Sequence, residues 1–313
     1  MFNINNEQQK QQFLEIMTAL KKVNSDWIEI RQSGEYRIGM VWKKTISDLK
    51  KMKIKSILKN FNKWKMGLKK EIKYKDKNRQ INVKQKTCYF SDERIAIYTS
   101  IFGNYDDILE PYFVPDNCDF FIFTDRDDIP ETSVWKKIKT PKVIDNMSNI
   151  DKNRYIKMFP NKLFKDYKYS IYVDGNVQII TDLTEYIHYL KEDIGIGIHT
   201  HHLRSCVYDE LKAVVKGHRI TKAEAKKHKE YLEKTGMPKN YGLLQCNVIV
   251  RQHNNPKCIK VMNEWWKEFQ NYSKRDQISL PHVLFMNDIL ISEVGVLGNN
   301  VYRNPSFRVL NHN

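Results

Sequence analysis

Short apolar segments alternate with amphipathic ones from about residue 91 to the end of the chain. The apolar runs predict six β-strands, over 94–100, 119–125, 133–139, 169–175, 194–200 and 245–250. The segments between them have the hydrophobic spacing of helices and predict helices over 152–166, 181–192, 206–216, 221–235 and 257–272. Thr221 and Glu224 form a capping box, and Gly236 ends the helix that they begin. Strands that alternate with helices indicate an α/β fold with a mainly parallel sheet flanked by helices.

The N-terminal part has a different pattern, helical and without strands. A short helix is expected around residues 13–20 and a longer one from about 41 to 70. Apolar side chains in the longer segment form one stripe between lysines, and they are Trp42, Ile46, Leu49, Ile57, Phe61 and Trp64. Residues 71–88 are polar and resemble a linker. The pattern therefore predicts a basic helical extension with a linker over 1–88 and an α/β domain over 89–313.

The positive charge is concentrated in this extension. The chain of 313 residues has a net charge of +16, and residues 1–90 contain 22 of its 53 basic and 8 of its 37 acidic side chains. The extension thus has a charge of +14 and the rest of the chain only +2. Such a lysine-rich helix can pack on the main domain with a solvated lysine face, or lie on an anionic membrane with tryptophan at the interface. Nucleic-acid binding has no support beyond the charge.

Several classes of protein are excluded or disfavoured. No run approaches the roughly 18 apolar residues of a membrane-spanning helix, and the first twelve residues, MFNINNEQQKQQ, lack the apolar core of a secretory signal. The five cysteines are scattered without a CxxC motif, which favours reduced thiols in the cytosol and disfavours a cysteine-built zinc site. No GxGxxG or GxxxxGK[ST] motif supports a dinucleotide or P-loop site.

Polar residues follow several predicted strands, at the edge of the sheet where α/β proteins bind ligands. Asp174-Gly175-Asn176 ends an apolar strand and offers two oxygen ligands of the kind that Mg²⁺ and Mn²⁺ prefer. Gly103-Asn104 and Asp125 follow the first two strands, where they can border a nucleotide or simply form and cap turns.

Three further groups are candidates for hydrogen bonds to a sugar or phosphate. His201 and His202 follow the fifth strand, and Gln245 with Asn247 begins the sixth. Asp276-Gln277 opens a helix, where an acid can be a catalytic group or only a helix cap.

Six motifs in a fixed order carry a resemblance to a known family. They are YTSIFGNYD, FTD, NRYIKMFPNKLFKDYKYSIYVDGNV, HHLRSCVYDE, GLLQCNVIVR and YSKRDQISLP. Together they resemble the glycosyltransferase-like family formerly classed as a domain of unknown function, found in plant mucilage and cell-wall proteins and in bacterial capsule or lipopolysaccharide loci. The resemblance covers about 91–313 and leaves the extension outside. More distantly, the layout is similar to the glycogenin and galactosyltransferase family of GT-A enzymes.

The resemblance implies a GT-A-like, Rossmann-like fold and a division of roles at its site. Catalytic roles fall to Asp276, Gln277 and Asn247, and metal ligation to Asp174, Asn176 and His312. Donor binding falls to Thr99, Asn104, Tyr105, Asp125, Arg154, Lys157, Asp174, His201, His202 and Gln245. The family's DxD is DGN here, and the neutral amide weakens the expected affinity for metal.

The function implied is a metal-assisted, hexosyltransferase-like glycosyltransferase. It would use Mn²⁺ or Mg²⁺ and move a sugar from a nucleotide-sugar to a glycan or lipid-linked acceptor in capsule or lipopolysaccharide synthesis. We expect it in the cytoplasm, with peripheral attachment to the inner face of the membrane through residues 1–70. The alternatives are a nucleotide-sugar-binding protein with weak catalysis and a basic module associated with nucleic acid.

Overall fold

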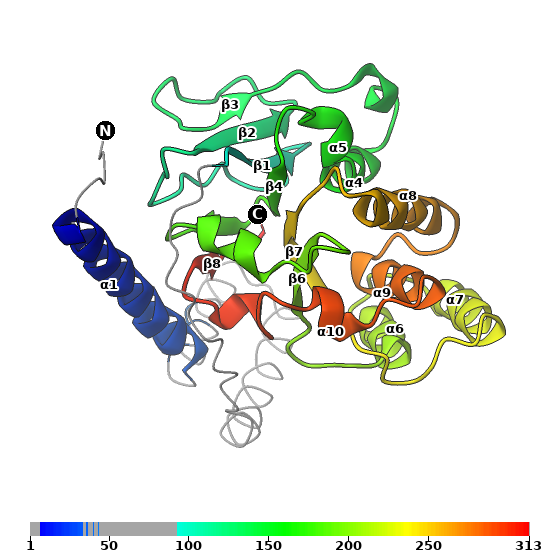
Figure 1. The fold of residues 1–313 in the computed structure, drawn as a ribbon. Helices are drawn as coiled ribbons and strands as arrows, with labels where there is room; N and C mark the ends of the chain where they lie inside the picture. The colour runs from blue at the N-terminus through cyan, green and yellow to red at the C-terminus, as the bar shows by residue number, and fades with distance from the viewer. Residues whose placement is uncertain (1–6, 34–35, 37–39, 41–42, 44–92, 313) are drawn as a thin grey trace. The chain divides into compact units, whose positions relative to one another are not determined.

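The computed structural model describes residues 7–33, 36, 40, 43 and 93–312, and the chain divides into two compact units (Figure 1). One unit spans Asn6–Lys84, and the other spans Gln85–Asn313 together with Met1–Asn5. Each is described by itself.

Helix α1, Glu7–Gln32, is the main described element of the first unit. Its 26 residues make it much longer than the short helix expected around 13–20. It contains four basic and four acidic residues, so the helix itself is not basic. The helix predicted from about 41 to 70 lies, apart from Lys43, outside the described residues, as does the linker over 71–88. Among the helices that are described, none is long and apolar enough to cross a membrane.

The second unit is built on a six-stranded sheet with the order β3-β2-β1-β4-β7-β6 (Figure 1). Its strands are β3 Lys136–Lys137, β2 Cys118–Thr124, β1 Ile95–Ile101, β4 Tyr169–Val173, β7 Leu244–Arg251 and β6 Ile196–Thr200. The first four run parallel, whereas β7 is antiparallel to both β4 and β6. The predicted fold class, a mixed and mainly parallel sheet flanked by helices, is therefore confirmed.

The remaining elements among the described residues of this unit are seven α-helices, three 3₁₀ helices and a small second sheet. The α-helices are α4 Asn149–Met158, α5 Pro160–Leu163, α6 Val207–Lys216, α7 Lys222–Lys234, α8 Pro256–Asn271, α9 Asp276–Met286 and α10 Ile291–Val294. The 3₁₀ helices are η2 Lys142–Ile144, η3 Thr184–Tyr189 and η4 Val301–Arg303. Strands β5, Val177–Ile179, and β8, Phe307–Val309, pair antiparallel as the second sheet.

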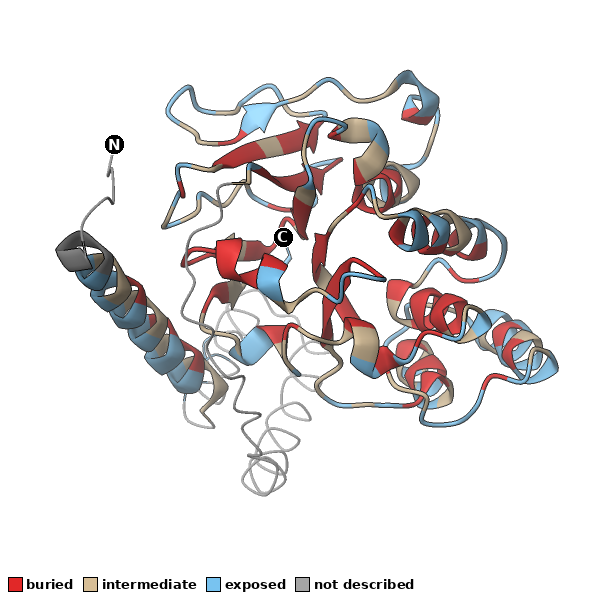
Figure 2. Ribbon diagram, viewed as in Figure 1, coloured by how far each residue is buried: buried red, intermediate tan, exposed pale blue. Residues whose placement is uncertain are grey.

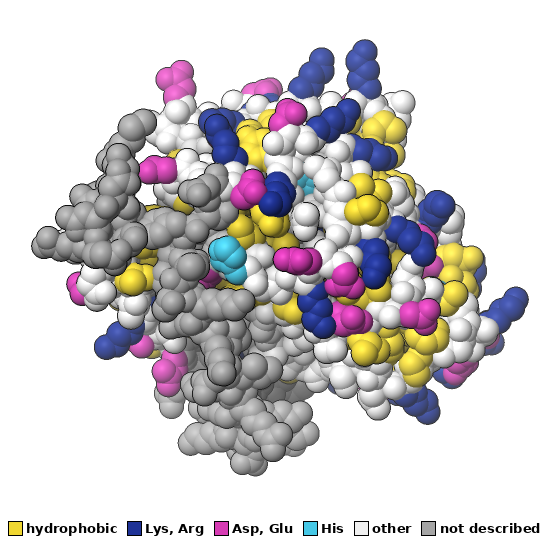
Figure 3. All heavy atoms as spheres, in the orientation of Figure 1, with side chains coloured by type: hydrophobic (Ala, Val, Ile, Leu, Met, Phe, Trp, Pro, Cys, Tyr) yellow, Lys and Arg dark blue, Asp and Glu magenta, His cyan; other side chains and the backbone are white. Residues whose placement is uncertain are grey.

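Both faces of the large sheet are buried (Figure 2). Alternate strand residues point to opposite faces, so Tyr98 and Tyr172 join one core, with Trp265 of α8. Ile97 and Val173 join the other, which includes Phe307 of β8. This double burial explains why the strands are continuous apolar runs in the sequence. On the face in Figure 3, acidic and basic side chains are interspersed, as the near-neutral composition of this part suggests.

Some predicted elements differ from the structure. Residues 181–192 were expected to form an α-helix, but only the 3₁₀ helix η3 forms there. The helix predicted over 152–166 is divided at Phe159, because Pro160 has no N–H to continue it. Of the strand predicted over 133–139, only the two exposed residues of β3 form a strand. Strands β5 and β8, three residues each, were missed because they are too short to show a period. The Thr221–Glu224 capping box is confirmed.

Candidate functional site

Four charged side chains and one amide meet where β4 ends. Lys157 Nζ lies 3.2 Å from Asp174 Oδ1 and 2.8 Å from Asp276 Oδ2. Arg154 Nε lies 2.7 Å from Asp276 Oδ1. Asn247 Nδ2 donates to Asp174 Oδ2 at 3.0 Å. We call these five residues the ion-pair network.

Four elements bring the ion-pair network together. Arg154 and Lys157 are three residues apart on α4 and so share a helix face. Asp276 is the first residue of α9, whose N-cap position is held by Arg275 without a side-chain cap. Asp174 directly follows β4, and its N–H donates to the carbonyl of Asn247 on β7 at 2.8 Å. The interpretation of Asp276 as only a helix cap is therefore wrong, since its carboxylate binds two cations.

The side chains of the network are ionised and mostly shielded from solvent. Burial alone raises the pKa of Asp276, but Arg154 and Lys157 outweigh it and lower that pKa to about 2. Burial acts against the charge of Arg154, yet Asp276 and Asp174 raise its pKa. Lys157 is 1% exposed, whereas the Arg154 and Asp174 side chains are 25% and 22% exposed. The network therefore meets solvent through one cation and one anion.

A second group of contacts fastens the end of the chain beside the same strand end. Asn176 Nδ2 donates to the carbonyl of Leu310 at 2.8 Å, and the N–H of Leu310 donates to the carbonyl of Asn176 at 2.8 Å. His312 Nδ1 lies 2.7 Å from Asp106 Oδ1. We call Asp106, Asn176, Leu310 and His312 the tail clamp. The ring of Tyr105, an exposed residue, lies 4.7 Å from that of His312.

The two predicted histidines after β6 have different surroundings. His202 Nδ1 is 2.8 Å from Gln245 Nε2, and Gln245 Oε1 accepts from the N–H of Val301 at 3.3 Å. His201 Nδ1 accepts from the N–H groups of Leu203 and Arg204. Burial, and then Arg204, lowers the pKa of His201 to about 4, so this ring is neutral at pH 7. His201 thus shapes its own loop, while His202 and Gln245 form a pair.

The candidates on the first two strands lie around a tight turn. Both oxygens of Asp125 accept from the N–H of Gly103, at 3.1 and 3.0 Å. Gly103 and Asn104 have φ of 68° and 53°, the left-handed region in which glycine and asparagine are favoured. The carboxylate of Asp125 therefore holds the turn that carries Asn104 and Tyr105.

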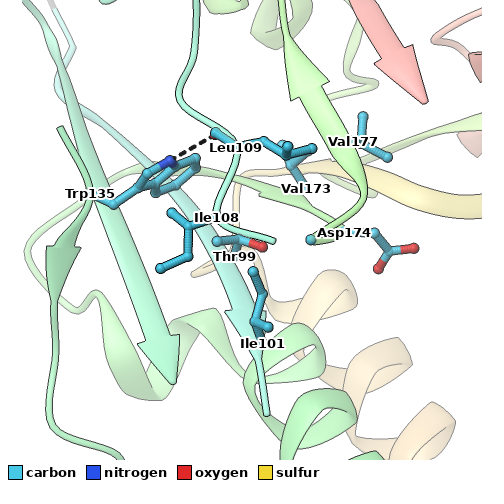
Figure 4. Close-up of a pocket in the computed structure, with 9 residues that line it drawn as sticks. Thr99, Ile101, Ile108, Leu109, Trp135, Val173, Asp174 and Val177 are labelled. Atoms are coloured by element: carbon cyan, nitrogen blue, oxygen red, sulfur yellow. Dashed lines mark hydrogen bonds between the residues drawn. The ribbon is translucent and has the colours of Figure 1, made fainter. Parts of the chain in front are cut away.

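Thr99 lies on a different side of the strand end. It is buried, its Oγ1 has no hydrogen-bond partner among the residues that the structure describes, and it lines a cavity of about 10 Å³ with Trp135 and Leu109 (Figure 4). That volume suits about one water molecule. Asp174 lines the same cavity, but its carboxylate points away from it in Figure 4, so Thr99 lies near Asp174 without facing that carboxylate.

The predicted metal ligands can be compared with the chemistry that Mg²⁺ or Mn²⁺ requires. Within the described ranges, no three His, Cys, Asp or Glu side chains are grouped as metal ligands. Asn176 is 6% exposed, however, and its Oδ1 has no hydrogen-bond partner in the described part of the chain. The carboxylate of Asp174, the amide oxygen of Asn176 and the imidazole of His312 are donor types that a hard divalent cation accepts. The chemistry of these three side chains is therefore compatible with such an ion.

Sequence reasoning missed Asp106. It directly follows the predicted Tyr105 in the GNYDD segment, so it could have been considered with that motif. Nothing local distinguishes it from Asp107, its exposed neighbour, because only the fold buries one carboxylate and leaves the other in solvent.

Comparison with known proteins identifies a family. The model of the TOD1/MUCI70 glycosyltransferase-like domain matches residues 46–292. The match begins earlier than the resemblance over 91–313, and it ends before Leu310 and His312. No curated protein matches the sequence.

Similar solved structures are also glycosyltransferases, at low identity. They include the bifunctional WbbM in its apo form, with 14% identity and a TM-score of 0.41 over 62% of this chain and 38% of that one. Mouse xyloside xylosyltransferase 1, also apo, has 11% identity and a TM-score of 0.38 over 62% of this chain and 82% of its own. The galactosyltransferase LgtC, solved with donor and acceptor sugar analogues, has 14% identity and a TM-score of 0.34. The match covers 61% of this chain and 70% of LgtC.

Proposed function

Because the chain belongs to the TOD1/MUCI70 glycosyltransferase-like family, we propose that it transfers a sugar from a nucleotide-sugar donor to a glycan or glycolipid acceptor. The ion-pair network carries this proposal. It places Arg154 and Lys157 at the edge of the sheet where α/β proteins bind ligands. A donor diphosphate is an anion that two fixed cations would attract.

The chemical step breaks the bond between the sugar's anomeric carbon and the diphosphate. Negative charge grows on the leaving group, and preorganised cations lower the energy of that state. Arg154 is the cation open to solvent, so it would contact the phosphates, while the buried Lys157 contributes its field. Asp276, with its pKa near 2, stays ionised and orients both cations instead of accepting a proton. Gln277 and Asn247 would bind sugar hydroxyls.

We propose that Mn²⁺ or Mg²⁺ is held by Asp174, by Asn176 through its unpartnered Oδ1 and by His312. When bound, the ion would neutralise charge on the diphosphate oxygens. Asp174 can keep its hydrogen bond from Asn247 because a carboxylate has about four acceptor positions.

The nucleoside would lie beside the turn after β1. Tyr105 is 61% exposed and offers an aromatic face for a base. Asn104 and Asp125 border the same turn. Thr99 would support it from the buried side, and His201, His202 and Gln245 would shape the sugar side of the pocket.

One assay decides between enzyme and binding protein. A thermal-shift panel of UDP-, GDP-, CMP- and dTDP-sugars, with and without Mn²⁺, identifies the donor. The same radiolabelled donor is then followed for transfer or slow hydrolysis. Product formation supports the proposal, binding without product supports a nucleotide-sugar-binding protein, and no binding overturns both.

We further propose that the acceptor belongs to capsule or lipopolysaccharide synthesis and that residues 1–70 attach the protein to the inner membrane face. The +14 charge of residues 1–90 supports attachment, since each lysine near an anionic surface contributes about 1 kcal/mol. Full-length protein should co-sediment with anionic liposomes, not with neutral ones, and dissociate at high salt. Equal recovery from both liposomes would overturn the electrostatic attachment.

A further inference from the structure

The third residue of the Asp174-Gly175-Asn176 triplet fastens the C-terminal tail. Strand β5 pairs with β8 from Ile179↔Phe307 to Val177↔Val309, and Asn176 with Leu310 continues the same ladder. The side chain adds a second bond, from Nδ2 to the carbonyl of Leu310. An aspartate could not donate this bond, because an ionised carboxylate only accepts. The amide thus has a structural reason to replace a second carboxylate.

The second residue of the triplet makes room for Asp106. A Cβ added at Gly175 would lie 2.8 Å from Ile101 Cγ1, closer than real side chains approach, and 3.0 Å from Asp106 Oδ2, tighter than most such contacts. Asp106 is 7% exposed and would have to shift by a few tenths of an ångström. Gly175 therefore allows a carboxylate to be buried against the backbone of the triplet.

This buried carboxylate sets which nitrogen of His312 carries the proton. Asp106 Oδ1 lies 2.7 Å from Nδ1 of His312. An ionised carboxylate can only accept, so a neutral His312 must carry its proton on Nδ1 and leave a lone pair on Nε2. Metal-binding histidines in proteins are commonly held by a carboxylate in this way. Nε2 has no partner among the described residues, and the side chain is 48% exposed.

We propose that Asp106 is a positioning residue of the donor site, which holds His312 with Nε2 free to bind a divalent cation, while Asn176 fastens the tail that carries this histidine. Binding of the cation rests on the proposed function. The tautomer of His312 does not depend on that function, so an experiment can contradict either one without the other.

The tautomer is measured first, in the full chain labelled with ¹⁵N-histidine. The His312→Gln variant assigns the resonances. Wild type should show His312 protonated on Nδ1 at neutral pH, and Asp106→Asn should lose that preference because an amide can either donate or accept. Asp107→Asn makes the same change at the exposed neighbour and should leave His312 unaltered. A proton on Nε2 in wild type, or no change in Asp106→Asn, overturns the positioning role.

Calorimetry of Mn²⁺ binding, without nucleotide-sugar, tests whether the Asp106–His312 pair serves a cation. Asp106→Asn should weaken Mn²⁺ about ten- to a hundredfold. The same substitution in the His312→Gln background should have little further effect, because Asp106 acts through His312. Equal losses in both backgrounds would mean that Asp106 acts independently of the histidine. No Mn²⁺ binding by wild type would overturn the assignment of Nε2 to a cation, whereas absent turnover with the expected tautomer would count against the transferase function only.

Discussion

The ion-pair network and the tail clamp use the same triplet, yet they are built differently. Lys157, in the network, is 1% exposed, whereas His312, in the clamp, is 48% exposed. The network joins charges from three parts of the core, while the clamp joins a loop to the last few residues of the chain. Breaking the network should therefore cost stability as well as chemistry, and breaking the clamp should cost ligand binding with little loss of stability.

The largest effect is expected for Lys157→Met. Removing the ammonium leaves the buried Asp276 with one cation and deprives Asp174 of its only ion pair among the described residues. Breaking a buried ion pair by removing one partner costs up to about 3–5 kcal/mol, and the retained Arg154 should keep the loss at the lower end of that range. Urea denaturation measures the change, with Lys165→Met at an exposed position as the control. A loss below about 1 kcal/mol would mean that the network is not energetically coupled.

Asp276→Asn should give the next largest effect, and that effect should depend on pH. Because the pKa of Asp276 is lowered from 3.8 to about 2 in the folded protein, its contribution is present above pH 4 and is lost as the pH falls towards 2. This pKa shift corresponds to a contribution of about 2 kcal/mol to the free energy of unfolding. The stability gap between wild type and variant should therefore narrow by about that amount between pH 5 and pH 2. A gap that stays constant over this range would contradict the shift.

Turnover of the same variant tests whether Asp276 orients the two cations. Loss of their fixed geometry should lower kcat by about a hundredfold or more. Unchanged kcat with reduced stability would restrict Asp276 to a structural role.

Asp174→Ala separates chemistry from stability within the network. The side chain of Asp174 is 22% exposed, and Lys157 keeps its ion pair with Asp276 in the variant. We therefore expect the free energy of unfolding to fall by only about 1 kcal/mol. Transfer should nevertheless fall by about a hundredfold or more, because Asp174 is proposed to hold the cation at the donor diphosphate. The exposed Asp166→Ala is the control for both measurements. Wild-type turnover in purified Asp174→Ala would remove Asp174 from the site.

The smallest change in stability is expected for His312→Gln, in the clamp. A half-exposed residue near the chain end should change the free energy of unfolding by less than about 0.5 kcal/mol. The Mn²⁺ concentration needed for half-maximal transfer should rise at least as far as in Asp106→Asn, about ten- to a hundredfold, because the proposed ligand itself is lost. If stability falls as far as in Asp276→Asn, the contrast between the two regions is wrong.

The sequence by itself determined the α/β class, five of the six strands of the large sheet to within about two residues, and the positions of Asp174, Arg154, Lys157 and Asp276 within motifs. These features are local, since apolar periodicity and turn residues are read over a few positions. The family resemblance added the glycosyltransferase-like identity, which the match over 46–292 confirms.

Only the tertiary structure decided which charges meet. Arg154 and Asp276 are 122 residues apart in the chain, and Asp106 and His312 are 206 apart. No periodicity spans such separations, so the sequence could not show that Asp276 binds two cations or that Asp106 is buried while Asp107 is exposed. The short pairing of β5 with β8 was hidden for the same reason: a strand of three residues forms only because its partner is brought to it.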